Sequence, residues 1–346
     1  MKKARPTNEE LRRFVDQEFV STTKAGLESR FREHALELSA AELKQIEIMK
    51  SIDREGAHKG HGWVPVKKPD GTTRLILENW NSIKYWSEAK TQVDINVIEA
   101  TRKRYNADIL AGVEHQVNFS KADEDRQFHD LFGFGEERKS VEAHNRNNKE
   151  HRSAYGGTGV MVFGRLSNYV KKAGDHDPTG LGRWCSLVIK SGEKLVRIVV
   201  VYRPNKESSS RQQRRGNGAG SVWRQHNRYF RAIGRDDGDP LQFFDRDLCA
   251  TLRSWRAAGE EIILAGDLNA NVYTSSIAKD LAHQDIGLVE QFHALYDEPA
   301  PFSHFSGSEP IMGVFATPGI QVTAAFLSKH KVKGTVGDHR LHVFDS

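Results

Sequence analysis

Short apolar runs that end in polar side chains most constrain what this chain can fold into. The clearest run is Ile262 to Ala265, which is followed by Gly266 and then by Asp267-Leu268-Asn269. Side chains two positions apart share one face of a strand, so Asp267 and Asn269 are predicted to project together from its carboxyl end. A carboxylate beside an amide can orient a water molecule and hold a phosphate oxygen. Because Asp and Asn also form turns, this motif alone favours an ordinary turn at a strand end.

Four further apolar runs carry polar groups at one end. These groups are Asn81 after the run 74–77, Glu114 after 108–113, Tyr202 after 199–201, and Asp338-His339 before 341–344. An acid at a strand end can bind a metal, and an adjacent carboxylate and imidazole can also handle a proton. Each of these features taken alone is equally typical of a solvated strand edge or a turn. The five strand ends together predict one shared polar site.

The arrangement of predicted elements favours two packed sheets with outer helices over a doubly wound fold. Helices are predicted over residues 86–104, with Val93, Val97 and Ile98 inward, and over 221–234 and 240–258. Strands are predicted at 74–77, 107–113, 159–163, 184–189, 195–202, 261–265, 302–305, 311–316, 320–327 and 340–344. The polar segment 120–155 is predicted to form a surface loop or short helices.

Residues 1–60 differ from the rest and are predicted to form a helical N-terminal extension to a main domain over 61–346. Two capping boxes, Thr7 to Glu10 and Ser39 to Glu42, would begin its helices. Its 12 basic and 11 acidic residues nearly cancel, so it does not read as a nucleic-acid arm. Packing on the main domain or on a protein partner is the expected role.

The whole chain has a formal net charge of +5, which is mildly basic. The basic residues concentrate between 203 and 235, where nine Lys or Arg residues accompany one acid, Glu207. Six arginines of this block are predicted to contact nucleic acid: Arg203, Arg211, Arg214, Arg215, Arg224 and Arg228. Trp223 and Tyr229 lie among them, and packing of a helix core is favoured over base stacking for both.

The remaining composition predicts an intracellular protein. Cys185 and Cys249 provide neither a disulfide framework nor a zinc-binding spacing. No apolar run approaches the roughly 18 residues that a membrane helix needs, and the N-terminus does not read as a secretory signal. No membrane partner is therefore expected.

The order Asn, Glu, Tyr, Asp-x-Asn, Asp-His over residues 74–345 resembles the endonuclease/exonuclease/phosphatase superfamily. The resemblance implies an α+β fold, a DNase I-like four-layer sandwich of two packed mixed β-sheets flanked by helices. The segment Gly157-Thr158-Gly159-Val160 resembles the glycine turn before a central strand of that family. Segments 225–233, 244–255, 267–270 and 310–320 look like the endonuclease domains of retroelements, which would make a reverse transcriptase domain a partner.

The resemblance also implies a divalent-metal-dependent endonuclease that hydrolyses nucleic acid, with DNA as the expected substrate. Mg²⁺, or Mn²⁺ as the alternative, would be held by Asn81, Glu114 and Asp338. Asp267 would be the general base, and Asn269 and Tyr202 would contact phosphate oxygens. His339 would stabilise the charge that develops on the phosphorus.

Two positions depart from the family pattern. Met312 stands where relatives hold an aspartate that supports the histidine, and Ile83 stands where some hold a further acid. By analogy with a Ser-His-Asp triad, losing such a carboxylate can lower the rate by a few orders of magnitude. Either Glu309 or a water molecule replaces it, or the enzyme is slow or inactive. The alternatives to a nuclease are therefore an inactive nucleic-acid-binding member of the same fold and a phosphatase or phospholipid-cleaving member.

Overall fold

The computed structural model describes residues 60–81, 83, 89–122, 127–133, 135–147, 154–174, 177–206, 221–330 and 336–346. The predicted helical extension up to Lys59 lies outside the described residues, as do Arg211, Arg214 and Arg215. Among the described residues, no helix combines the length and the apolar character needed to cross a membrane.

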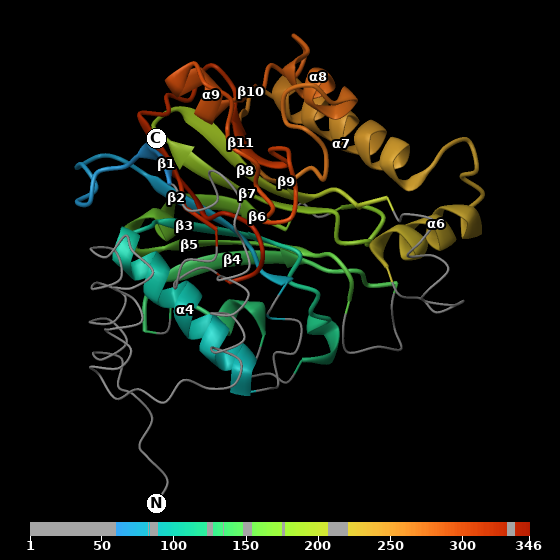
Figure 1. Ribbon diagram of the computed structural model, residues 1–346, viewed down its shortest axis with the longest axis horizontal. Coiled ribbons are helices and arrows are strands. Elements are labelled where there is room, and N and C mark those ends of the chain that lie inside the picture. Colours follow the sequence, from blue (N-terminus) through green and yellow to red (C-terminus); the bar gives the residue numbers. More distant parts are fainter. Residues whose placement is uncertain are drawn as a thin grey trace, which may run out of the picture.

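Two mixed β-sheets pack face to face (Figure 1). In spatial order, the first sheet contains β1 (His61–Trp63), β12 (Ala324–Leu327), β13 (His342–Asp345), β2 (Arg74–Asn79), β3 (Ile109–Val113), β5 (Thr158–Phe163) and β4 (Arg138–Ala143). The second contains β10 (Val289–Glu290), β11 (Met312–Ala316), β9 (Glu261–Asp267), β8 (Lys194–Tyr202), β7 (Trp184–Ser191) and β6 (Val170–Ala173). Neighbours are antiparallel except for the pairs β2–β3 and β8–β9, which run parallel.

The inner core lies between the two sheets because alternate residues of each central strand face inward. In β3, Ile109 and Ala111 belong to the inner core, whereas Leu110 belongs to the cluster on the outer face. In β8, Val200 belongs to the inner core and Val199 to the opposite outer cluster. Both sheets are apolar on both faces, so each needs a covering layer outside.

Helices provide those covering layers. Helix α4 (Ala89–Tyr105) packs Ile95 and Ile98 over the outer face of the first sheet. Helix α7 (Pro240–Ala257) packs Phe244 and Leu248 over the second sheet, together with α8 (Ser276–Ala282). From one outer face to the other, the four layers are α4, the first sheet, the second sheet and α7 (Figure 1). Helices α6 (Val222–Ala232) and α9 (Gln291–Tyr296) lie at the sides. The predicted α+β sandwich of two helix-flanked mixed sheets is confirmed.

Some local predictions were wrong for physical reasons. The segment predicted as a loop or short helices contains β4, whose outward residues are polar and whose buried residues are Val141 and Ala143. Residues 302–305 form no strand, and His304 makes only an isolated bridge to His339. Val93 of α4 is 51% exposed, because Ile95 and Ile98 supply the buried stripe.

Glu78 of β2 is a buried acid on a strand that the fold covers completely. Neither carboxylate oxygen has a hydrogen-bond partner of normal geometry within the described ranges. Burial raises the pKa of Glu78 to about 8, and Trp80 opposes only part of that rise. The folded protein therefore keeps this proton between about pH 4.5 and pH 8, whereas the unfolded chain releases it. The stability contributed by the protonated group is lost as pH rises through that window.

We predict that Glu78→Gln removes this pH dependence. The free energy of unfolding of the variant minus that of the wild type should be larger at pH 8 than at pH 5, by on the order of a few kcal/mol. Urea denaturation at the two pH values measures the difference. Glu193→Gln, at an exposed position between β7 and β8, is the control, and its free energy of unfolding should depend on pH as that of the wild type does. Parallel pH profiles for wild type and Glu78→Gln would contradict the prediction.

Candidate active site

The polar strand ends meet at one edge of the sandwich. Asn79 ends β2 opposite the end of β3, and Tyr202 ends β8 opposite Asp267, the last residue of β9. Each lies two residues after an inward-facing residue (Leu77, Val200 and Ala265, in that order), so strand alternation aims all three toward the space between the sheets. Strand β13 begins antiparallel beside β2, which brings the preceding Asp338 and His339 to the same edge.

Glu114 is held by amide side chains. Asn79 Nδ2 donates to Glu114 Oε2 at 3.0 Å, and Gln116 Nε2 donates to Oε1 at 3.1 Å. Burial raises the pKa of Glu114, and the charge of Asp338 raises it further against the hydrogen bond from Asn79. Glu114 has a left-handed backbone with φ of 60°, a conformation that clusters at functional sites.

The turn Gly156-Gly157 supports this unusual backbone. The Glu114 N–H donates to the Gly157 carbonyl at 2.7 Å, and the Gln116 N–H donates to that of Gly156 at 2.8 Å. A Cβ on Gly157 would lie 2.4 Å from the His115 ring, and the φ of Gly157 is 94°. Only glycine fits this position, which gives the glycine turn noted in the sequence a structural reason.

Asp267 and Asn269 form a second unit. The Asn269 N–H donates to Asp267 Oδ1 at 2.8 Å, and Asn269 Nδ2 donates to the Arg203 carbonyl at 2.6 Å. Asp267 is almost fully buried. Burial raises its pKa well above the usual value, and the charges of Glu114 and Asp338 add to the rise. The three carboxylates therefore lie within electrostatic reach of one another.

Asp338 and His339 complete the group. Asn81 Nδ2 donates to Asp338 Oδ1 at 3.0 Å. His339 Nε2 lies 3.7 Å from Asp267 Oδ2 and 3.8 Å from Asp338 Oδ1, which is too long for a hydrogen bond but close enough for electrostatic contact. Burial lowers the pKa of His339 to about 4, although the charge of Asp338 opposes this. The imidazole is therefore neutral at neutral pH.

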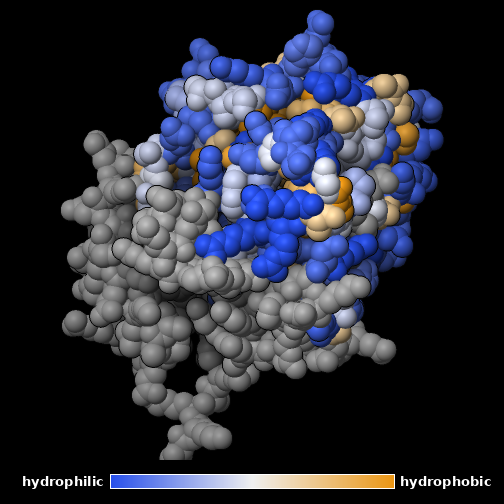
Figure 2. Space-filling model, turned by 90° about the vertical axis from the view of Figure 1, so that its right-hand side faces the viewer, coloured by the Kyte–Doolittle hydropathy of each residue, from blue (hydrophilic) through white to orange (hydrophobic). Residues whose placement is uncertain are grey.

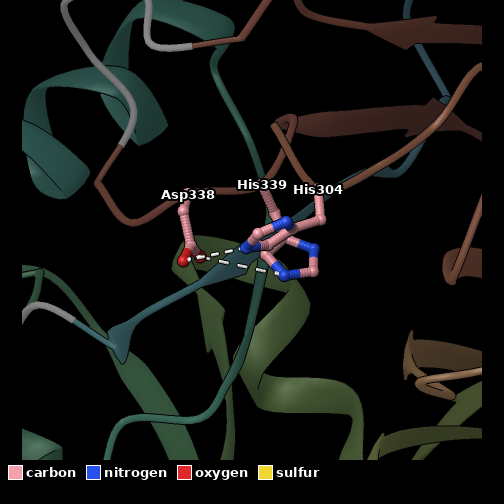
Figure 3. A group of neighbouring side chains, drawn as sticks. All are labelled: His304, Asp338 and His339. Atoms are coloured by element: carbon pink, nitrogen blue, oxygen red, sulfur yellow. Dashed lines mark hydrogen bonds and ion pairs between the residues drawn. The ribbon is translucent and has the colours of Figure 1, made fainter. Parts of the chain in front are cut away.

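His304 also belongs to the site and was missed in the sequence. Its Nε2 lies 3.1 Å from Asp338 Oδ2, and its ring centroid lies 5.0 Å from that of His339 (Figure 3). Burial alone would raise the pKa of Asp338, but the hydrogen bond with His304 and the interaction with the His339 and His304 rings in their protonated forms lower it. His304 lies in the segment wrongly predicted as a strand, and no local motif marks it.

Comparison with solved structures identifies the fold. The AP endonuclease LMAP from Leishmania major matches with a TM-score of 0.57 and 14% identity, over 89% of this chain and 99% of its own. The catalytic domain of human Nocturnin matches with a TM-score of 0.53 and 15% identity, over 85% and 98%. The 3′ phosphatase NExo from Neisseria, bound to a product DNA hairpin, matches with 0.52 and 13% identity, over 79% and 98%. This chain has the fold of the endonuclease/exonuclease/phosphatase superfamily. No family model matches its sequence, and the comparison with curated proteins gave no match.

The expected superfamily site residues that lie within the described ranges, Asn81, Glu114, Tyr202, Asp267, Asn269, Asp338 and His339, all lie at this edge. Burial raises the pKa of Tyr202 well above 10, and the charges of Glu114 and Asp267 contribute to the rise. The phenol therefore stays protonated and can donate a hydrogen bond. Ile83, by contrast, is fully buried and offers no ligand.

Arg203 does not lie on a surface, which corrects the expectation that it contacts nucleic acid. It is buried, and its guanidinium pairs with Asp245 at 2.7 Å. Its backbone carbonyl accepts a hydrogen bond from the Asn269 side chain, so Arg203 helps to position the site. Arg228 of α6 is exposed and Arg224 is half-buried. Figure 2 shows the side of the molecule that carries α6 and α7, where hydrophilic side chains cover most of the described surface.

Met312 lies directly beside the site. It pairs with Asp267 across β11 and β9, is fully buried, and donates its N–H to Ser303 Oγ at 3.1 Å. His339 Nδ1 is buried and has no hydrogen-bond partner in the described part of the chain. Glu309 is exposed and meets Ser303 through its backbone carbonyl, which does not support it as a replacement for the missing acid.

We predict that Met312→Asp raises the pKa of His339 from about 4 by one pH unit or more, about the effect of a nearby opposite charge. The new carboxylate would accept a hydrogen bond from Nδ1 and stabilise the imidazolium. Titration of histidine ring resonances by NMR, in the presence of EDTA, measures the pKa. Met312→Asn is the matched control, because it adds a polar group of similar shape without charge. Equal His339 pKa values in the two variants would show that residue 312 does not reach the imidazole.

Proposed function

We propose that this protein is a divalent-metal-dependent phosphodiesterase that cuts the backbone of nucleic acid, with DNA as the substrate. The observation that carries the proposal is the convergence of Glu114, Asp267, Asp338 and His339 at one edge of a DNase I-like sandwich. Three carboxylates beside one imidazole and one phenol suit the hydrolysis of a phosphate ester, which needs a base, a cation and hydrogen-bond donors.

The donor atoms fit Mg²⁺, with Mn²⁺ as the alternative. Asn81, Glu114 and Asp338 provide the carboxylate and amide oxygens that such hard ions prefer, and would hold the ion. Asp338 raises the pKa of Glu114, a repulsion that a bound cation would relieve. When bound, the ion would supply positive charge beside the scissile phosphate.

In its ionised form, Asp267 would orient the attacking water and take its proton. Its Oδ1 accepts the Asn269 N–H, which leaves Oδ2 on the side of His339. Asn269 directs one amide hydrogen at the Arg203 carbonyl and hydrogen-bonds to Tyr202, from which the second hydrogen would turn to a phosphate oxygen. The protonated Tyr202 phenol and neutral His339 are further donors toward the charge that develops on the phosphate.

A nicking assay on supercoiled plasmid tests the proposed activity. The protein should convert plasmid to the open circle with Mg²⁺ or Mn²⁺ and should fail with EDTA. Hydrolysis of a phosphoinositide or a phosphomonoester, with no cleavage of plasmid, would instead identify a phosphatase or phospholipid-cleaving enzyme. Relation to a retroelement and to a reverse transcriptase stays a prediction from the sequence.

Asp267→Asn should lower the nicking rate by about 10²–10⁴-fold, which is the usual contribution of a general base. Its affinity for DNA should be equal or higher, because a negative charge near the phosphate is removed. Rates from plasmid nicking and affinities from fluorescence anisotropy separate the two effects. Asp280→Asn, on the exposed face of α8, is the control. Wild-type nicking by Asp267→Asn would remove Asp267 from the mechanism.

Replacing Arg211, Arg214 and Arg215 together with glutamine should weaken DNA binding and flatten its salt dependence. Each lost phosphate contact lowers the slope of log affinity against log salt by about 0.9. The control replaces Lys171, Lys190 and Lys194, exposed residues at the end of β6, β7 and β8 remote from the site. It removes the same charge and should leave the slope nearer to the wild type. Identical slopes for the two triple variants would refute a specific role for residues 211–215.

The second candidate function is a nucleic-acid-binding protein whose catalytic site is inactive. The observation that favours it is Met312 at the place of a supporting acid, with His339 Nδ1 left without a partner in the described structure. It requires DNA binding without metal-dependent nicking in the wild type. A gain of nicking in Met312→Asp, with none in Met312→Asn, would assign that inactivity to residue 312.

A further inference from the structure

We propose that His304, Asp338 and His339 form a binding site for a transition-metal ion of the Zn²⁺ type. One ligand atom from each residue can be chosen such that all three lie within 4.8 Å of one another. Two imidazoles and a carboxylate differ in chemistry from the oxygen donors proposed to hold Mg²⁺. Imidazole nitrogen suits Zn²⁺ and related ions, whereas Mg²⁺ favours oxygen.

The two imidazoles lie side by side and approach different oxygens of one carboxylate. His304 Nε2 lies 3.1 Å from Asp338 Oδ2, and His339 Nε2 lies 3.8 Å from Oδ1. Ligands about 2.0–2.2 Å from a tetrahedral zinc ion are separated from one another by roughly 3.3–3.5 Å, which falls between these two distances. The rings meet edge to face at 72°, so they do not stack, and Figure 3 shows both directed toward the carboxylate.

The site is open to an ion from one side and supported on the other. The side chains of His304 and Asp338 are 25% and 30% exposed, whereas that of His339 is 4% exposed. Two ligands are therefore reachable from solvent, and the third forms the floor of the site.

Ser306 supplies the outer contact that a metal-bound histidine requires. His304 Nδ1 lies 2.8 Å from Ser306 Oγ and accepts the Ser306 N–H at 3.1 Å. In this arrangement the His304 proton is on Nε2 and points at Asp338. Metal binding at Nε2 moves the proton to Nδ1, which then loses the hydrogen bond from the Ser306 N–H and donates to Ser306 Oγ. The Ser306 hydroxyl thus serves both tautomers.

Occupation of this site would inhibit the hydrolysis, and this part of the inference rests on the proposed function. Asp338 is shared, since its Oδ1 accepts from Asn81 while its Oδ2 meets His304. A transition-metal ion that binds Asp338 and His339 withdraws both from the Mg²⁺-supported reaction. Zn²⁺ should therefore inhibit at concentrations far below those of Mg²⁺.

Titration of the full-length protein with Co²⁺, followed by its visible absorption and by competition with Zn²⁺, tests the binding site. The variant His304→Gln keeps a hydrogen-bond donor for Asp338 but removes the imidazole ligand. Its affinity for Zn²⁺ should fall by about tenfold or more, since even outer-contact changes cost 10–100-fold. His283→Gln, at an exposed histidine paired with Asp285, is the control and should bind as the wild type does. Unchanged affinity in His304→Gln would overturn the proposal.

A second variant and a second readout keep the test decisive. If His304→Gln fails to fold by circular dichroism, His339→Gln replaces it in the same titration with the same expected loss. In Mg²⁺-supported nicking, Zn²⁺ should inhibit the wild type and should require a higher concentration in His304→Gln. Zn²⁺ binding that depends on His304, without any nicking, would leave this site intact and reject the proposed function. Nicking supported by Zn²⁺ alone would overturn the inhibition.

Discussion

The repulsion among three neighbouring carboxylates, the buried Asp267 and the partly buried Glu114 and Asp338, is the constraint around which the site is built. Charges that leave water need partners, and here each acid receives hydrogen bonds from a separate set of donors. Asn79 and Gln116 donate hydrogen bonds to Glu114. The Asn269 backbone N–H donates to Asp267, and Asn81 and His304 hydrogen-bond to Asp338. This division explains why amides are so frequent around the acids, and why backbone strain occurs at Glu114 and Asn269, where the chain turns to deliver these groups.

Much of the fold and most of the acids could be predicted from the sequence, because inward-facing and outward-facing side chains alternate along each strand and this alternation is visible in the sequence. The inward face of β9 passes through Ile263 and Ala265, and the same period of two carries it on to Asp267. Glu114 follows β3 directly, and Asp338 precedes β13 by a few residues. Parallel pairing of β2 with β3 and of β8 with β9 places the carboxyl ends of these strands at one edge, and β13, antiparallel to β2, begins at the same edge. Gly157, close against the His115 ring, depends on a contact that alternation does not encode.

The rest depends on tertiary contacts that no local pattern reports. His304 reaches Asp338 from a loop fixed by Ser303, whose backbone carbonyl accepts the Arg340 N–H and whose hydroxyl accepts the Met312 N–H. The basic block 203–235 predicted that Arg203 contacts nucleic acid. Its guanidinium instead pairs with Asp245, which lies 42 residues away in sequence, and the side chain is buried. Charge counted along a chain cannot distinguish an arginine that faces solvent from one that supports a strand end. Burial decides that, and burial is a property of the packed sheets.

Met312 can be understood through the same electrostatic constraint. It occupies the position opposite Asp267 in the sheet, so an acid there would be a fourth carboxylate beside Asp267, whose pKa Glu114 and Asp338 already raise. Methionine avoids that repulsion and packs into the inner core, and its consequence is a His339 whose Nδ1 meets no acceptor within the described chain. His304 partly offsets this loss, because it lies beside both Asp338 and His339 and adds an imidazole where the site lacks a carboxylate. With a methionine at 312 and an imidazole at 304, the cluster carries less negative charge than it would with a further acid, and it has an additional nitrogen donor. In the proposed metal site this donor would favour ions that accept nitrogen ligands.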